Sequence, residues 1–373
     1  MKQTLFVTLF IRILMTAAFI SRIMTIEAQE VLELSLTPSL TEIGCVPAGS
    51  FCLYDASRQA HLFVYVPNTA QLWQYPYDMS PAIQYDLTSF KNDIGTGPYL
   101  DFVAISDTEM VFLGMQRSGG ENLTVYNLMT HQIRTPVIDF GDIRIRGCDG
   151  LPSTPTDSLY VFPDSSRVLV CGRSDSFQLI VVDMAVEKIE QVIEIPLIHA
   201  NPALLPWHKV LVGLDRNIYL QNPVVFANKD ERDIFRTVNR PQLLDNTITV
   251  LRYNQRDANW TLLQIPEALY ILLEESASSG ISEIAGVDKQ GYIYYWNAYY
   301  REDKFMPLLT IFAGDGEFIS HVPIDILLEA EISTYLYQST NGEIVFLPNN
   351  PLEALSSIDV TDFLLNSLST PTP

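Results

Sequence analysis

Few residues of this chain have the spacing that catalysis requires. The five histidines, which form neither H-x-x-x-H nor H-E-x-x-H, are His61, His131, His199, His208 and His321. No serine stands in a G-x-S-x-G elbow, and neither a P-loop nor a G-x-G-x-x-G phosphate loop is present. The sequence therefore predicts no catalytic, cofactor-binding or metal-ligating residue. Calcium stays open at Asp315-Gly316-Glu317, although this stretch lacks the alternating oxygen ligands of an EF-hand loop.

Aromatic side chains are the residues best suited to binding. Tyr292, Tyr294 and Trp296 would lie on one side of a strand, since successive side chains alternate between the two faces, and Trp73 belongs to a second aromatic run. Two uses are open for them. They would pack between neighbouring sheets, or they would form a platform for a sugar ring or an apolar peptide, because Tyr and Trp combine apolar area with a polar group.

Four cysteines, an even number, indicate a disulfide framework if the protein enters an oxidising compartment. They are Cys45, Cys52, Cys148 and Cys171, and Cys45 and Cys52 flank a Pro-Ala-Gly-Ser turn. Four cysteines allow three pairings, and spacing alone does not choose among them. The paired short spacings of a zinc site are absent.

The amino-terminal segment is typical of a secretory signal peptide. Lys2 precedes an apolar stretch, and Ile26-Glu27-Ala28 would be a tolerable cleavage site. Residues 1–28 are therefore predicted to be removed on export. The alternative is an uncleaved anchor, against which Arg12 counts because a charge inside a spanning helix is costly.

The chain is strongly acidic. It has 23 Lys and Arg against 44 Asp and Glu, a net charge of −21. Such a surface repels phosphate backbones and anionic lipids, which argues against a nucleic-acid partner and against membrane contact beyond an N-terminal anchor. It favours solubility and cationic partners.

Short apolar runs recur along the chain with turns between them, which favours an all-β repeat protein. In residues 163–196, PDSSRVLVCGRSDSFQLIVVDMAVEKIEQVIEIP, three strand-like runs alternate with polar turns. The middle runs of comparable units start at Leu72, Leu123, Leu179, Ile218, Ile248, Ile293 and Ile344. At about 45 residues per blade, this rhythm predicts a β-propeller of three- to four-stranded antiparallel blades, preferably seven, with six or eight as alternatives.

Residues 163–196 also resemble the repeat of bacterial secreted surface-layer and YVTN-type β-propellers. Pro163-Asp164 and residues 168–170, 179–183 and 192–196 follow the order of that repeat, whereas Ser165 stands where the family prefers Gly. The resemblance implies a propeller architecture and secretion. It implies no reaction, because the family is functionally mixed.

The remaining segments complete the expected organisation. Residues 29–360 would form the propeller, the alternating residues 31–39 would add a strand to the last blade, and residues 361–373 would be a flexible tail. Residues 222–245 interrupt the rhythm and are predicted to be an inserted loop. Asn122-Leu123-Thr124 and Asn259-Trp260-Thr261 are N-glycosylation sequons, which matter only in a eukaryotic host.

The functional expectation is a secreted or cell-envelope binding module. One face of the propeller would engage a protein or a glycan without catalysis. The alternative is a calcium-assisted lactonase- or lyase-like enzyme with its site in the central channel.

Overall fold

A computed structural model describes most of the chain between Leu32 and Asp359. The described residues are 32–35, 38–39, 42–43, 45, 52–58, 61–76, 80–94, 101–116, 120–146, 148, 159–163, 165–174, 177–195, 209–221, 247–266, 278–301, 304–321, 332–338, 343–348 and 354–359. The predicted signal peptide, inserted loop and tail lie outside these residues. Within them, no helix is long and apolar enough to span a lipid bilayer.

The described strands form six antiparallel sheets, which we number as blades along the chain. Blade 1 contains β2 (Leu53–Arg58), β3 (His61–Val66), β4 (Gln71–Pro76) and β5 (Ile83–Asp86). Two short helices follow it, η1 (Thr88–Phe90) and α2 (Lys91–Ile94). Blade 2 contains β6 (Asp101–Ala104), β7 (Glu109–Gln116), β8 (Gly120–Asn127) and β9 (Gln132–Arg134). Blade 3 contains β10 (Arg144–Arg146), β11 (Tyr160–Val161), β12 (Arg167–Arg173), β13 (Phe177–Asp183) and β14 (Lys188–Glu194).

The second half of the chain forms three more blades. Blade 4 contains β15 (Lys209–Val212), β16 (Ile218–Gln221), β17 (Thr247–Asn254) and β18 (Asn259–Pro266). Blade 5 contains β19 (Ser278–Val287), β20 (Ile293–Arg301), β21 (Lys304–Phe312) and β22 (Phe318–His321). Blade 6 contains β23 (Ile332–Gln338), β24 (Glu343–Pro348), β25 (Ala354–Asp359) and the N-terminal β1 (Leu32–Ser35).

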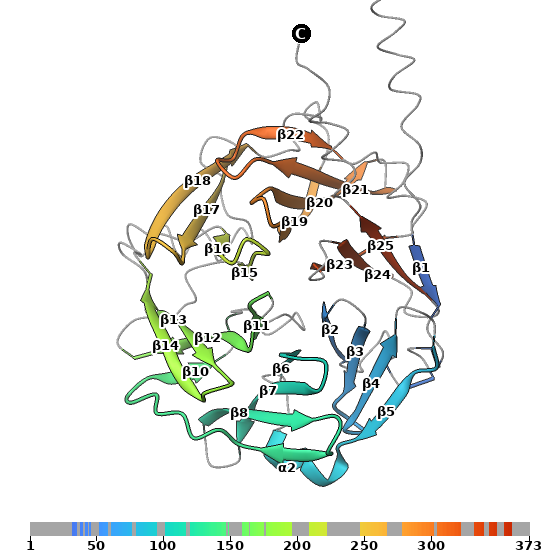
Figure 1. The fold of residues 1–373 in the computed structure, drawn as a ribbon. Coiled ribbons are helices and arrows are strands. Elements are labelled where there is room, and N and C mark those ends of the chain that lie inside the picture. Colours follow the sequence, from blue (N-terminus) through green and yellow to red (C-terminus); the bar gives the residue numbers. More distant parts are fainter. Residues whose placement is uncertain are drawn as a thin grey trace, which may run out of the picture.

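The blades are arranged around a central axis, which makes the fold a β-propeller (Figure 1). The innermost strands contact one another in a closed cycle, in the order β2, β6, β11, β15, β19, β23 and back to β2. The ring is closed by the N-terminal strand, because β1 pairs antiparallel with β25 and so becomes the outer strand of blade 6. The strand predicted within residues 31–39 is therefore confirmed.

The preferred count of seven blades is wrong. The described strands form five four-stranded blades and one five-stranded blade. The sequence pattern predicts two repeats at the runs starting at Ile218 and Ile248, but they lie in β16 and β17, which pair directly with each other in blade 4. The segment predicted to be an insertion therefore connects two strands of one blade.

Apolar side chains on both faces of each blade explain why the strands read as continuous apolar runs. In blade 2, Phe102 and Phe112 belong to the cluster shared with blade 1, whereas Val103 and Val111 belong to the cluster shared with blade 3. The alternation of side chains along a strand thus supplies two neighbouring blades at once. A blade cannot cover both of its own faces, so the ring is required to complete the core.

Buried polar side chains also join neighbouring blades. The backbone N–H of Ala104 in blade 2 donates to Asp55 Oδ2 in blade 1 at 2.6 Å, and Leu159 N–H next to blade 3 donates to Asp101 Oδ2 in blade 2 at 2.7 Å. Between blades 4 and 5, Ile284 N–H donates to Gln221 Oε1 at 2.7 Å. We call these three contacts the inter-blade latches. Each gives a backbone N–H group at or beside an inner strand a side-chain oxygen of the preceding blade as its acceptor.

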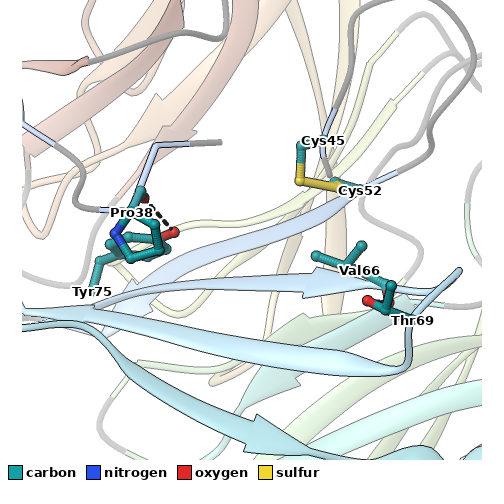
Figure 2. Close-up of a disulfide and its surroundings, with 6 residues drawn as sticks. All are labelled: Pro38, Cys45, Cys52, Val66, Thr69 and Tyr75. Atoms are coloured by element: carbon teal, nitrogen blue, oxygen red, sulfur yellow. Dashed lines mark hydrogen bonds between the residues drawn. A yellow bond between two sulfur atoms is a disulfide. The ribbon is translucent and has the colours of Figure 1, made fainter. Parts of the chain in front are cut away.

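The structure chooses one of the three cysteine pairings, Cys45–Cys52 and Cys148–Cys171. The first disulfide lies in the link between β1 and β2, where the Tyr75 hydroxyl also donates to the Pro38 carbonyl at 2.9 Å (Figure 2). The link that carries the ring-closing strand is thus fastened to blade 1 at two points. Two disulfides fit a protein of an oxidising, extracellular environment.

Removing the Cys148–Cys171 disulfide by a double alanine substitution is expected to lower the free energy of unfolding by about 3 kcal/mol. The bond closes a loop with a sequence separation of 23, so its loss frees that loop in the unfolded chain. Double alanine substitution of Cys45 and Cys52, with a separation of 7, is expected to cost about 2.5 kcal/mol by the same relation. Urea unfolding of both variants measures the difference. Variants as stable as the wild type would show that these bonds do not form.

Candidate functional site

One face of the ring collects two turns of each blade. In the four-stranded blades these are the turns between the first and second and between the third and fourth strands, and in blade 3 they are the turns between β11 and β12 and between β13 and β14. These turns share an end because successive strands of an antiparallel meander reverse direction. Contacts between blades confirm the placement: Leu214 N–H, in a turn of blade 4, donates to the Val287 carbonyl at the corresponding turn of blade 5 at 2.8 Å. We call this the turn face.

The outer turns of the turn face share one geometry in blades 2, 3 and 4. Asn127, Asp183 and Asn254 end β8, β13 and β17, and the Oδ1 atom of each accepts backbone N–H groups two or three residues ahead. Each turn ends on a residue in the left-handed region, namely His131 (φ 54°), Glu187 (φ 54°) and Ala258 (φ 49°). Such side-chain to backbone bonds fix the turn locally.

These turns expose apolar side chains on adjacent blades. Met129 of blade 2 is 74% exposed and Val186 of blade 3 is 60% exposed, both at turn tips. Ile83, the first residue of β5 and thus at the same end of blade 1, is 47% exposed. Leu128 and Met184 precede the two tips and are buried, so each turn is anchored while its tip stays open to solvent. We call Ile83, Met129 and Val186 the apolar tips.

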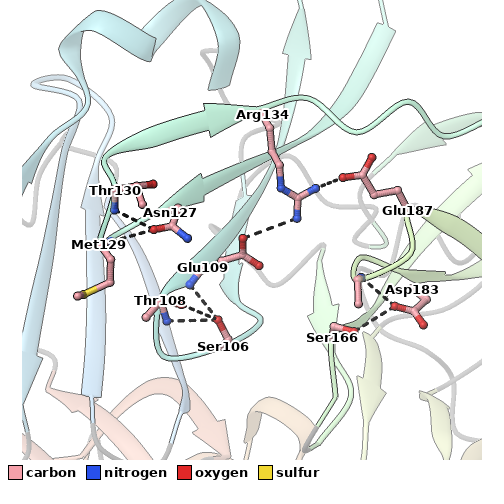
Figure 3. A network of polar contacts seen from close by, with 11 residues as sticks. Ser106, Thr108, Glu109, Asn127, Met129, Thr130, Arg134, Ser166, Asp183 and Glu187 are labelled. Carbon is pink, nitrogen blue, oxygen red and sulfur yellow. Dashed lines mark hydrogen bonds and ion pairs between the residues drawn. The ribbon is translucent and has the colours of Figure 1, made fainter.

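A charge network joins blades 2 and 3 next to the turns that carry Met129 and Val186 (Figure 3). Arg134 of blade 2 donates to Glu187 in the outer turn of blade 3 and lies 3.7 Å from Glu109 Oε1. In the turn between β6 and β7, Ser106 Oγ accepts the N–H groups of Thr108 and Glu109 at 3.2 and 3.0 Å and so fixes the turn that precedes Glu109. Partly exposed ion pairs of this kind contribute at most about 1 kcal/mol each, so the network positions the turns more than it stabilises the fold.

Two aspartates lie at the seam between blades 4 and 5, also on the turn face. Asp215 Oδ2 accepts the Tyr219 hydroxyl and the Asn217 side-chain amide, both at 2.6 Å. Burial, and next the Asp215 charge, raise the pKa of Tyr219. Gly213 is required here because a Cβ would lie 3.0 Å from Val287 Cβ and would collide with the Asp215 carboxylate.

Asp288 is the matching aspartate of blade 5. Its Oδ1 accepts the N–H groups of Gln290 and Tyr292 at 2.9 Å each, and its Oδ2 accepts the Tyr294 hydroxyl at 3.0 Å. Burial raises the pKa of Asp288, while these hydrogen bonds oppose the rise. The carboxylate oxygens of Asp215 and Asp288 thus accept hydrogen bonds within their own turns. Both residues therefore stabilise these turns and are not free to act on a substrate.

The predicted aromatic platform is not assembled. Tyr294 and Trp296 are fully buried in β20 of blade 5, so neither ring offers a face to a ligand. Tyr292 is half-buried beside them. Trp73 is half-buried in β4 of blade 1, where it stacks on Tyr75 with ring centroids 6.4 Å apart. Blades 1 and 5 are not neighbours, so the structure does not bring Trp73 to the other three.

No described residues form a group of three or more His, Cys, Asp or Glu side chains placed to hold a metal ion. Asp315 of the candidate calcium stretch accepts the Glu317 N–H at 3.1 Å within the turn between β21 and β22. His199 and His208 lie outside the described residues.

Asp215 and Asp288 were not predicted as a pair from the sequence, although a signal was present. Gly213-Leu214-Asp215 and Gly286-Val287-Asp288 are each followed by a Tyr that contacts the Asp. A search for Gly-x-Asp with a following Tyr would have found both. The tips of the outer turns show no comparable sequence pattern, because their apolar residues differ from blade to blade.

Exchanging Asp288 for Asn tests the buried charge through pH. The folded-state pKa is raised, so the stability that proton binding contributes is full below the unfolded pKa of about 3.9 and is lost as pH rises through the folded pKa. Because Asp288→Asn keeps an acceptor for the two backbone N–H groups, we expect it to be at least as stable as wild type at pH 7 and to lose that advantage near pH 4.

Urea unfolding at the two pH values measures the effect, and Asp288→Ala is the matched control. The alanine variant abandons three hydrogen bonds and should lose about 2–4 kcal/mol. A stability difference between wild type and Asp288→Asn that does not change with pH would contradict the buried charge.

Comparisons with known proteins show no family for this chain. No protein-family model and no curated protein matches the chain. The structure is similar to streptogramin B lyase, with 8% identity and a TM-score of 0.38 over 89% of this chain and 99% of that chain. It is similar to the β-propeller domain of the trilobed protease from Pyrococcus furiosus, with 13% identity and a TM-score of 0.41 over 87% of this chain and 100% of that chain. It is also similar to the WD40 β-propeller domain of Doa1, with 12% identity and a TM-score of 0.39 over 88% and 97%.

No family of the surface-layer or YVTN type is shown by these comparisons. Because all three scores are low, the assignment of this chain to the β-propeller fold rests on its own strand pairing and ring of inner-strand contacts.

Proposed function

We propose that this chain is a secreted or cell-surface β-propeller that binds another protein through the turn face of blades 1 to 3 and catalyses no reaction. Export would remove residues 1–28, and the two disulfides support an oxidising destination. The observation that carries the proposal is the set of apolar tips, which lie on three adjacent blades at the same face.

The chemistry of the apolar tips favours a protein over a glycan. Their side chains are aliphatic, whereas sugar recognition needs exposed aromatic rings, and two of the four predicted platform rings are buried. Exposed apolar side chains with a polar rim are typical of protein interaction sites.

The negative charge of this chain indicates the charge expected on the partner's surface. The net charge of the chain is −21, and the charge network between blades 2 and 3 has two carboxylates for one guanidinium, Glu109 and Glu187 with Arg134. A partner surface with Lys and Arg around an apolar centre is complementary to this arrangement. Binding should therefore weaken as salt concentration rises.

The enzymatic alternative has no supporting observation in the described part of the chain. Asp55 and Asp101, the buried carboxylates of the inner strands, accept backbone N–H groups of the next blade. A channel enzyme would need such carboxylates to be open to a substrate.

Site-specific photo-crosslinking tests the proposal. A photoreactive residue is placed at Met129, at Val186, or as the control at Leu262, which is 56% exposed but lies on the outer strand of blade 4. After mixing with proteins from the cell surface and medium of the source, positions 129 and 186 should give the same adduct and position 262 none. Excess wild type should suppress the adduct, whereas excess Met129→Glu/Val186→Glu should not.

Equal adducts at all three positions, or none at 129 and 186, would contradict a protein site at the apolar tips. Retention by an immobilised glycan, lost on Trp73→Ala but not on Met129→Glu/Val186→Glu, would replace the protein partner by a sugar.

A further inference from the structure

The two sequons have different surroundings in the folded protein. Asn122 lies in β8, is partly buried, and uses its Oδ1 atom to accept the Leu123 N–H at 2.9 Å. Thr124, the third residue of this sequon, is buried and donates its hydroxyl to the Asp93 carbonyl of α2 at 3.1 Å. A branched sugar on Asn122 would be attached to a side chain that is partly buried against its own blade. Asn122 is also only two residues from Thr124, which is hydrogen-bonded to α2.

The second sequon stands open. Asn259 is exposed and is the first residue of β18, the outermost strand of blade 4, directly after the left-handed residue Ala258. Asn259 and Thr261 lie on the same side of the strand because side chains alternate. Trp260 between them faces the other side, where its Nε1 donates to the Glu194 carbonyl of blade 3 at 3.0 Å. The Trp260 indole therefore anchors β18, whereas the side chains of Asn259 and Thr261 point away from the indole.

We propose that Asn259, and not Asn122, carries an N-linked oligosaccharide when the folded protein leaves a eukaryotic secretory pathway. The donor is a lipid diphosphate-linked oligosaccharide. The Asn259 Nδ2 atom forms a bond to C1 of the first sugar, the bond from C1 to the diphosphate oxygen breaks, and the lipid diphosphate leaves. The amide gives up one proton to a carboxylate of the transferase, and nothing is oxidised or reduced.

The position gives the glycan a consequence for binding. Asn259 follows the outer turn of blade 4 on the turn face, and this turn carries exposed Arg256 and Asp257 where blades 2 and 3 expose Met129 and Val186. Because Asn259 lies on the side of β18 that faces blade 5, a hydrated glycan there would leave the apolar tips of blades 1 to 3 open and would limit how far a partner extends around the ring past blade 4.

Expression in cultured eukaryotic cells tests the assignment on the full chain. A parallel version in which a proven leader replaces residues 1–28 separates a failure of export from a failure of glycosylation. Secreted protein is digested with a glycanase that converts the sugar-bearing Asn to Asp, and peptide mass spectrometry locates the conversion. We expect one glycan, at Asn259, with a matching loss of mass on digestion.

Matched variants complete the design. Asn259→Gln and Thr261→Ala should both abolish the mass loss, Thr261→Ser should retain it, and Asn122→Gln should leave it unchanged. Both Gln variants should be secreted with intact disulfides. Conversion at Asn122 in secreted protein, conversion at both positions, or exported protein without conversion at Asn259 would each overturn the proposal. The protein-binding proposal is tested separately, because crosslinking at Met129 does not depend on the sugar.

Discussion

Trp296→Ala is expected to lower the free energy of unfolding by about 3–5 kcal/mol, the usual loss for a large buried aromatic side chain. The indole is fully buried in β20. Its neighbour in the strand, Tyr295, belongs to the cluster between blades 4 and 5, so Trp296 faces the opposite side of the blade, toward blade 6. Alanine there would leave a cavity at the seam beside the ring-closing blade.

Urea unfolding followed by far-UV circular dichroism measures this loss. Trp73→Ala is the control, because Trp73 is only half-buried and should cost clearly less. A Trp296→Ala variant as stable as wild type but deficient in ligand binding would restore the platform interpretation.

Breaking two inter-blade latches at once should have a comparable effect. Asp55→Ala and Asp101→Ala each leave a buried backbone N–H without its carboxylate, of Ala104 and Leu159 respectively. Loss of a hydrogen bond to a charged group together with an unsatisfied donor costs about 2–3 kcal/mol, so the double variant should lose about 4–6 kcal/mol. Because both latches involve β6, the two losses need not be strictly additive.

Hydrogen exchange provides the specific measurement. In the double variant, hydrogen exchange at the amides of Ala104 and Leu159 should be faster than in wild type. The increase there should be larger than at the amides in the middle of β13. Asp101→Asn, which keeps an acceptor oxygen, should lose less than Asp101→Ala. Asp139→Ala removes only an exposed turn contact to Gly141 N–H and should change stability by less than about 1 kcal/mol. Unchanged exchange at both amides would show that the latches do not hold the blades.

The blade count shows where local patterns fail. The apolar runs at Ile218 and Ile248 look like separate repeats because a long segment divides them, and a sequence pattern does not tell a connection within a blade from one between blades. Pairing of Leu220 with Leu251 places both runs in one sheet. Strand pairing is a contact between distant residues, so only the folded chain decides it.

The aromatic residues show a second failure. Alternation correctly separates Tyr294 and Trp296 from Tyr295, but it does not say which side meets solvent. In a sheet with one open face, alternation would separate buried from exposed residues. Here all three rings are buried because neighbouring blades cover both faces of β20.

Properties that depend on neighbours in the sequence could be predicted from it: all-β repeats, polar turns and the strand within residues 31–39. They follow from side-chain alternation and turn chemistry, which act over a few residues. The tertiary structure alone decided the number of blades, the cysteine pairing, the latches of Asp55 and Asp101, and the gathering of Ile83, Met129 and Val186 on one face. Each of these joins residues that are far apart in the chain, and they meet only because no blade can bury both of its faces until the ring has closed.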